Sequence, residues 1–163
     1  MPDLATVVSA SLGNYYEFVA AQLHQWVDPL TEEQVWRNPH GYGNSVGHLV
    51  LHLTGNLNYY VGTRIAGTGY VRNRDREFTQ PEQPEKKQLL GEFDRAMTMV
   101  LDTIRRQSPS DWAAGYSAER ETEAKDRFTA LLRCAGHAYH HVGQIIYLSK
   151  ELAPGTRAGT EGG

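Results

Sequence analysis

The chain has 163 residues, of which 40% are hydrophobic and 21% are charged, and its formal net charge is −3. This balance is typical of a soluble globular protein and excludes a largely disordered chain. No block of like charge stands out, so we expect no nucleic-acid partner. No stretch approaches the roughly 20 apolar residues of a membrane-spanning helix, so we expect no membrane partner either.

The cysteine content and the N-terminal stretch indicate the compartment. Cys134 is the single cysteine, which rules out an intramolecular disulfide and favours a reducing environment. The stretch MPDLATVVSASLGNYYEF has neither a basic leader nor an uninterrupted apolar run, so it does not resemble a signal peptide. We therefore expect a cytoplasmic protein.

Apolar residues recur every three or four positions in four segments, which is typical of helices that bury one face. We predict these helices at about residues 3–27, 44–65, 84–107 and 121–152. On the last helix, the predicted inward face consists of Phe128, Leu131, Leu132, Ala135, Tyr139, Val142, Ile145 and Ile146.

Short polar motifs predict where the helices begin. Asp3 is the expected N-cap of the first helix, and either Asn44 or Ser45 is that of the second. The segment Thr31-Glu32-Glu33-Gln34 has the form of a capping box before a short helical turn. Pro84 is placed in the first turn of the third helix, where proline is favoured.

The charged segment 71–84, which ends in proline, predicts a long connection after the second helix. Four amphipathic helices joined in this way favour an all-α four-helix bundle. We expect a single domain over residues 1–152 and a flexible, glycine-rich tail over residues 153–163.

Two of the predicted helices carry a pair of histidines four residues apart, His48 with His52 and His137 with His141. Side chains at this spacing share one helix face, about 6 Å apart along the axis. Such pairs supply two imidazoles to one metal ion, so together they predict a metal site. The alternative is that these histidines are hydrogen-bonded in the core. His140 is turned about 100° from His141 and is not expected to join the pair.

Several patterns of known catalytic sites are absent from the sequence. No histidine begins the HExxH motif of zinc proteases, and none follows a glutamate by three residues as in ferritin-like di-iron proteins. The glycine-rich phosphate loops GxxxxGK[ST] and GxGxxG do not occur. What remains is a mononuclear, histidine-rich site with no obvious carboxylate.

Two segments resemble the DinB/YfiT-like superfamily of four-helix-bundle metalloenzymes. The first is NSVGHLVLHLTGN, residues 44–56, in which a serine cap is followed seven residues later by a histidine. The second is HAYHHVGQI, residues 137–145, which matches the superfamily pattern His-x-x-x-His-x-Gly-Gln. RNRDREF, after the second helix, is similar to uncharacterised members. The resemblance extends over nearly the whole chain, to about Leu152.

The resemblance implies that His52, His137 and His141 hold one divalent ion, either nickel, zinc or iron, with at least one open position. Counting from Ser45 selects His52, and His48 is the alternative. Characterised members of the superfamily include transferases and isomerases that use a low-molecular-weight thiol such as mycothiol, bacillithiol or a glutathione-like molecule. The resemblance also implies a homodimer.

Four other residues are secondary candidates. Gln144, after His141, and Asn56, one turn after His52, could orient an imidazole or hydrogen-bond a metal-bound water. Each could equally bond to nearby backbone. Arg74 is a candidate for binding a substrate carboxylate, although mixed charges also describe a solvated loop. Cys134 is expected to be a buried small side chain rather than a reactive thiol.

An open three-histidine site without a protein nucleophile favours a metal-dependent transferase, in which an activated thiol attacks a small electrophile. One alternative is a metal-dependent hydrolase that uses a bound water, which a carboxylate near the metal would favour. Another is a non-catalytic metal-binding or structural dimeric bundle, which a closed site would favour. The expected partners are a small-molecule substrate and a second copy of the chain.

Overall fold

The structure, a computed structural model, describes residues 1–79 and 83–153. Four long helices form its body: α1 (Leu4–Val27), α3 (Val46–Leu57) with the π-helix η1 (Asn58–Ala66) that continues it, α5 (Lys86–Arg105) and α7 (Arg127–Leu152). Three short helices lie in the connections: α2 (Glu32–Trp36), α4 (Arg76–Thr79) and α6 (Pro109–Trp112). The predicted all-α four-helix bundle is confirmed.

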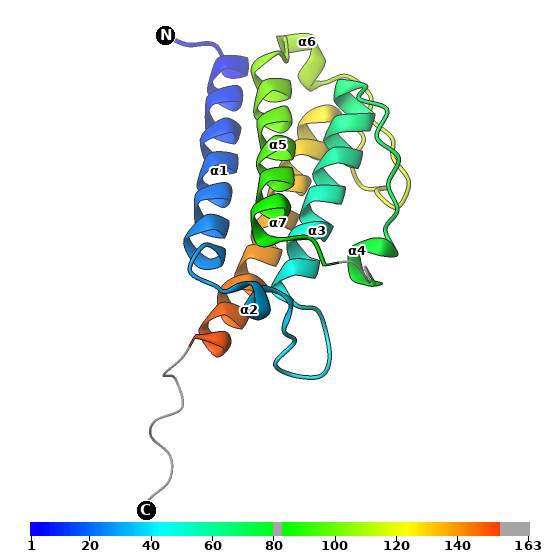
Figure 1. Cartoon of the computed structure of the whole chain (residues 1–163). Coiled ribbons are helices and arrows are strands. Elements are labelled where there is room, and N and C mark those ends of the chain that lie inside the picture. Colours follow the sequence, from blue (N-terminus) through cyan, green and yellow to red (C-terminus); the bar gives the residue numbers. More distant parts are fainter. Residues whose placement is uncertain (80–82, 154–163) are drawn as a thin grey trace, which may run out of the picture.

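The four long helices pack so that α1 lies beside α5 and α7, and α3 lies beside the same two helices (Figure 1). In the view of Figure 1, α1 and α7 run downwards whereas α3 and α5 run upwards. The chain must therefore return along the bundle between η1 and α5. This return is the long connection that the sequence predicts after the second helix.

The core is built from apolar side chains of all four long helices. Tyr16, Leu53, Phe93 and Leu131 are among the largest fully buried side chains. The hydroxyl of Tyr16 on α1 donates a hydrogen bond to the carbonyl of Leu131 on α7, at 2.7 Å. A buried hydroxyl needs such a partner. The bond helps to fix the position of α7 along the axis of α1, and therefore also the position of the histidines farther along α7.

The predicted helix starts are largely confirmed. Asp3 caps α1, and Thr31 and Gln34 form the capping box of α2. Ser45, rather than Asn44, caps α3, because its hydroxyl accepts the hydrogen bond from a backbone N–H three residues on. This cap sets the register of the whole of α3.

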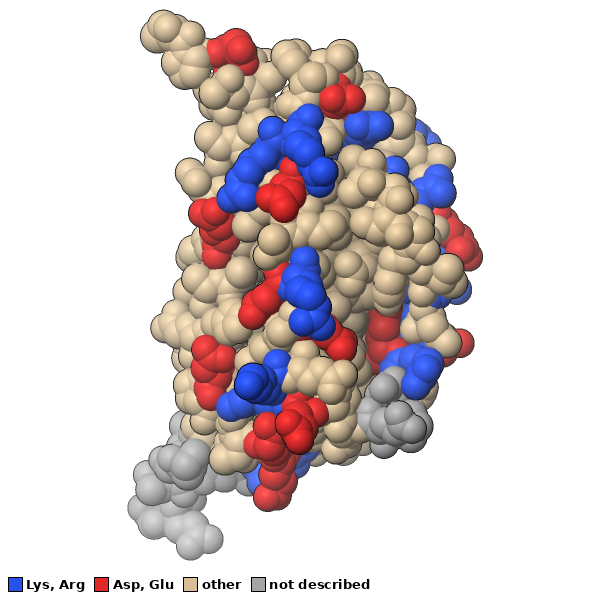
Figure 2. All heavy atoms as spheres, turned by 45° about the horizontal axis from the view of Figure 1, so that its top comes forward, with Lys and Arg blue, Asp and Glu red and all other residues tan. Residues whose placement is uncertain are grey.

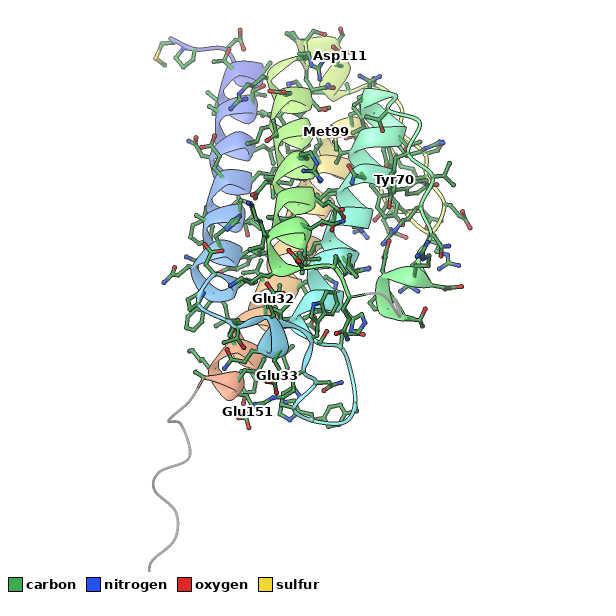
Figure 3. The ribbon with its side chains drawn as sticks, viewed as in Figure 1. Glu32, Glu33, Tyr70, Met99, Asp111 and Glu151 are labelled. Carbon is green, nitrogen blue, oxygen red and sulfur yellow. The ribbon has the colours of Figure 1, made fainter. Side chains whose placement is uncertain are left out.

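The lower end of the bundle is closed by α2. Glu32 lies in the first turn of α2 (Figure 3). Its carboxylate accepts a hydrogen bond from the backbone N–H of Lys86 at 2.9 Å. The ammonium of Lys86 donates to the carbonyl of Leu30 at 2.6 Å. These bonds connect the beginning of α5 to the segment between α1 and α2.

Two predicted boundaries are wrong. The last helix begins at Arg127 rather than near residue 121, because the side chain of Asp126 caps it. Residues 115–126 instead form a hairpin-like loop with two isolated β-bridges, called the 115–126 hairpin below. α5 begins after Pro84, which therefore precedes its first turn.

Part of the predicted inward face of α7 is exposed. Phe128, Leu132 and Tyr139 keep 37%, 51% and 40% of their surface, although periodicity places them in the core. The apolar residues of α7 cover more than one face, and the bundle buries the face that contains Leu131 and Ala135. Spacing alone does not tell which of two adjoining stripes faces inward.

The described surface mixes charges of both signs. On the face seen in Figure 2, basic and acidic side chains lie side by side, without a wide area of one sign. Within the described ranges, none of the helices has the length and apolar character that crossing a bilayer requires. The predicted glycine-rich tail lies outside the described residues, apart from Ala153.

Candidate metal centre

Three histidines from two helices meet at one side of the bundle: His52 on α3, and His137 and His141 on α7. Nε2 of His52 lies 3.0 Å from Nε2 of His137. One nitrogen from each ring lies within 4.8 Å of the other two. Three ligands of a tetrahedral ion, with metal–nitrogen bonds of about 2.0–2.1 Å, lie about 3.3 Å apart. Small movements would therefore let the three imidazoles share one ion.

A buried carboxylate, that of Glu77, contacts the ring of His52. Nδ1 of His52 donates a hydrogen bond to Oε2 of Glu77, at 2.8 Å. Arg72 lies 3.3 Å from the same nitrogen, but a guanidinium and an Nδ1–H are both donors, so the shorter bond to Glu77 decides which ring nitrogen carries the proton. With the proton on Nδ1, the lone pair of Nε2 faces the other two histidines. Carboxylates fix metal-binding imidazoles in this way.

Glu77 itself is held by Arg72. Nε and Nη2 of Arg72 donate to its two oxygens at 2.7 and 2.8 Å, which is a bidentate pair. The side chains of Arg72 and Glu77 are only 10% and 6% exposed. Burial acts to raise the pKa of Glu77, but the hydrogen bonds from Arg72 and His52 outweigh it and hold the pKa below its usual value. Glu77 is therefore ionised near neutral pH and can accept both bonds.

Glu77 reaches His52 only because residue 55 of α3 is glycine. A Cβ built on Gly55 would overlap Oε1 of Glu77. Gly55 lies three residues after His52, on the adjoining part of the same helix face. The missing side chain thus gives the carboxylate room to lie against the helix backbone.

The two residues predicted to support the ligands take different positions. Oε1 of Gln144 lies 2.6 Å from Nδ1 of His141, which can donate to it and leave Nε2 with a lone pair. Asn56 is 6% exposed, and its Oδ1 has no hydrogen-bond partner in the described structure. A buried acceptor of this kind requires a partner. Asn56 lines the cleft beside His52, although this oxygen itself is buried.

The environment of His137 and His141 favours their neutral form. Burial, followed by the nearby His141 and His52, lowers the pKa of His137 to about 3. Burial also lowers the pKa of His141, against the opposing effect of its bond to Gln144. A metal ion binds the neutral form of histidine. The donor set therefore fits a divalent ion such as zinc, nickel or iron, for which imidazole is a suitable ligand.

The three histidines open onto a cleft of about 780 Å³. This size is within the range of small-molecule sites. The cleft is lined by Asn44, His52, Asn56, Tyr60, Arg72, Arg74, Phe78, Arg120, Glu121, Arg133, Cys134, His137, His141 and Gln144. An open cleft beside the histidines gives a substrate access to them.

His48, the alternative to His52, lies outside the cluster. Its Nδ1 is 2.8 Å from Oγ of Ser45, and its ring meets the edge of Trp36 with centroids 5.5 Å apart. Ser45 lies within Gly43-Asn44-Ser45-Val46-Gly47, which has the GxSxG spacing of a hydrolase nucleophile. Ser45 is only 1% exposed and caps α3, and no strand precedes it in the described chain. The helix-cap role accounts for both residues.

The other candidates are also placed by the structure. Arg74 lines the cleft, with its guanidinium over the ring of Phe78 at 5.2 Å. His140 is exposed on α7 and is not among the three clustered histidines. Cys134 is buried at the cleft wall, and burial raises the pKa of its thiol to about 12. This agrees with the prediction that Cys134 is not a reactive thiol.

Sequence reasoning missed the carboxylates of this region. RNRDREF is predicted as a solvated loop, but Arg72 and Glu77 are buried against His52. Glu121, expected at the start of a helix, lines the cleft from the 115–126 hairpin. The available signal was Gly55, a small residue one turn from His52 that leaves space for a side chain.

The protein is a helical bundle in which α3 and α7 direct three imidazoles into one cleft. This combination of fold and site is that of a helical-bundle protein with a candidate mononuclear metal centre. The chain belongs to the DinB superfamily, whose family model matches residues 15–145. The match includes both helices that carry the histidines. No curated protein matches the sequence.

Proposed function

We propose that this protein is a divalent-metal-dependent enzyme, and most specifically a transferase that joins a low-molecular-weight thiol to a small electrophile. His52, His137 and His141 are the proposed ligands of one nickel, zinc or iron ion. The observation that carries the proposal is the open three-histidine cluster in a cleft whose own thiol, Cys134, is kept protonated by burial. A cleft without a reactive protein thiol suits a nucleophile that arrives as a cosubstrate.

The residues around the cluster support this chemistry. Glu77 and Gln144 orient the imidazoles of His52 and His141 through their Nδ1 atoms. When bound, a divalent ion lowers the pKa of a coordinated thiol or water. A reducing compartment such as the cytoplasm would keep such a thiol available.

The proposal is tested by the rate of thiol consumption. Protein loaded with zinc, nickel or iron is mixed with monochlorobimane as the electrophile and with bacillithiol, mycothiol or glutathione in turn. We expect one thiol to be consumed faster with wild-type protein than with His137→Ala, which should match the uncatalysed rate. Equal rates for the two proteins with every thiol and metal would contradict a thiol-dependent transferase.

A metal-dependent hydrolase is the second candidate, because the cleft contains the carboxylate that such an enzyme needs. Glu121 lines the cleft, but its Oε1 accepts a hydrogen bond from Nε of Arg133 at 2.8 Å. This pairing occupies a carboxylate oxygen that a general base would need for the attacking water, so we favour the transferase. Under the hydrolase alternative, Glu121→Gln would abolish turnover of an ester such as 4-nitrophenyl acetate while metal binding persists.

We also propose a homodimer, formed through an outer apolar face of α1 and α7. This face consists of Leu4, Val7, Tyr15, Phe18, Phe128, Leu132 and Tyr139, all of which are exposed. The rings of Tyr15, Phe18 and Tyr139 lie 5.8–6.1 Å apart. A contiguous exposed apolar patch of this kind is typical of an interaction site.

Replacing Phe18 and Tyr139 together by glutamate is expected to convert the dimer into a monomer of 18.3 kDa, because the charges would be buried in the interface. Light scattering after gel filtration measures the mass. Tyr147→Glu is the control, because Tyr147 is an exposed aromatic residue of α7 outside this face. A wild-type monomer, or a double variant that stays dimeric, would refute the interface.

A further inference from the structure

The cleft beside the three histidines is lined by four arginines, and two of them already have a carboxylate partner. Arg72 is bonded to Glu77, and Nε of Arg133 donates to Oε1 of Glu121. Arg74 has no carboxylate within 4.0 Å in the described structure. Nε of Arg120 reaches Glu119 only at 4.0 Å, and both of these side chains are mostly exposed. An exposed pair at that distance contributes little.

Arg74 is held in place by an aromatic ring, and no ion pair of Arg74 is found among residues 1–79 and 83–153. Its guanidinium lies over the ring of Phe78, 5.2 Å from the centroid, and Phe78 in turn lies against His52 with centroids 4.9 Å apart. Arginine stacks on aromatic faces in this way and keeps its N–H donors free at the edge of the guanidinium. Arg74 thus presents hydrogen-bond donors within the cleft, one aromatic ring away from a proposed metal ligand.

Arg120 lines the same cleft from the tip of the 115–126 hairpin. Its φ is 63°, a left-handed conformation that is unfavourable for a non-glycine residue. Non-glycine residues with a positive φ are retained where contacts with the surrounding structure stabilise that conformation, and they are concentrated at functional sites. Here the turn directs the side chain of Arg120 to the cleft wall.

Hydrogen bonds between the 115–126 hairpin and η1 stabilise this conformation. The hydroxyl of Tyr60 donates to the carbonyl of Glu119 at 3.1 Å, and the hydroxyl of Tyr116 donates to the carbonyl of Tyr60 at 3.0 Å. Nε of Arg64 donates to the carbonyl of Ser117 at 2.7 Å. The tip that carries Arg120 is therefore anchored to the helix that continues α3, which carries His52.

We propose that Arg74 and Arg120 form an anion subsite, which binds a carboxylate of the molecule that reacts at the three-histidine cluster. This inference rests on the proposed function, because it specifies the class of substrate for the same cleft. Guanidinium groups bind carboxylates through paired hydrogen bonds, and among the described residues neither of these two has a carboxylate closer than 4.0 Å. The carboxylate could belong to the thiol or to the electrophile.

Calorimetric titration of zinc-loaded protein tests the subsite with three probes. Mercaptosuccinate carries a thiol and two carboxylates, α-thioglycerol carries a thiol and two hydroxyls, and succinate carries only the carboxylates. If the carboxylate belongs to the thiol, mercaptosuccinate should bind at least about tenfold tighter than α-thioglycerol, as expected for a charge-assisted contact. If it belongs to the electrophile, the two thiols should bind alike and succinate should bind to protein saturated with α-thioglycerol.

In either case, Arg74→Gln combined with Arg120→Gln should reduce the carboxylate-dependent binding at least about tenfold. The control combines Arg95→Gln with Arg106→Gln, which removes the same charge from an exposed position of α5 and from its exposed C-cap, both outside the cleft. Unchanged binding of all probes by the Arg74/Arg120 variant would overturn the subsite. Succinate is also titrated into metal-free protein, so that binding at the arginines is measured without the metal. Failure to bind zinc would refute the proposed function but would leave this test of the subsite intact.

Discussion

Replacing His137 by alanine is expected to abolish stoichiometric binding of a divalent ion. The change leaves two imidazoles, and the loss of affinity should exceed the 10–100-fold typical of groups that only support a ligand. His52→Ala and His141→Ala should have the same effect, because each contributes one nitrogen to the cluster. Elemental analysis of protein purified without a histidine tag measures the metal content.

His48→Ala and His140→Ala are the matched controls for this experiment. Both remove a histidine from the same two helices, but neither side chain belongs to the cluster. Their metal content should equal that of the wild type. Full occupancy in all three cluster variants would refute the assignment of the ligands, whatever the metal.

Glu77→Gln is expected to weaken metal binding by about 10- to 100-fold. Glutamine keeps the size of the side chain but removes the charge that accepts the Nδ1 proton of His52 and pairs with Arg72. Gly55→Ala should act in the same direction, because the new methyl group would occupy the position of Oε1 of Glu77. Competition with a chromophoric chelator measures both affinities.

Gly136→Ala is the control for Gly55→Ala. Gly136 precedes His137 on α7, and a Cβ there would meet no atom within 4 Å. It should leave metal affinity unchanged and raise stability by up to about 1 kcal/mol, as alanine does in a helix. Wild-type affinity in both Glu77→Gln and Gly55→Ala would show that the carboxylate does not support the site.

The sequence alone determined the features that depend on near neighbours in the chain. Asp3, Ser45 and the Thr31 capping box mark helix starts, because a cap bonds to backbone only two or three residues away. The four-residue spacing of His137 and His141 likewise places both on one face of α7, since a helix has 3.6 residues per turn. The long connection could be predicted from the composition of its segment, but the burial of Arg72 and Glu77 within it could not.

The family motif favoured His52 over His48, but only the tertiary structure supplied the physical reason, because a pair of histidines four residues apart is the same on an isolated helix. The choice depends on how α3 is turned toward α7, which brings His52 to His137 across 85 positions of sequence. The burial of Glu77 depends on a connection that folds back onto Gly55, and the exposure of Tyr139 depends on which stripe of α7 the other helices cover. Each is a contact between distant segments, and spacing along one segment contains no information about its partner.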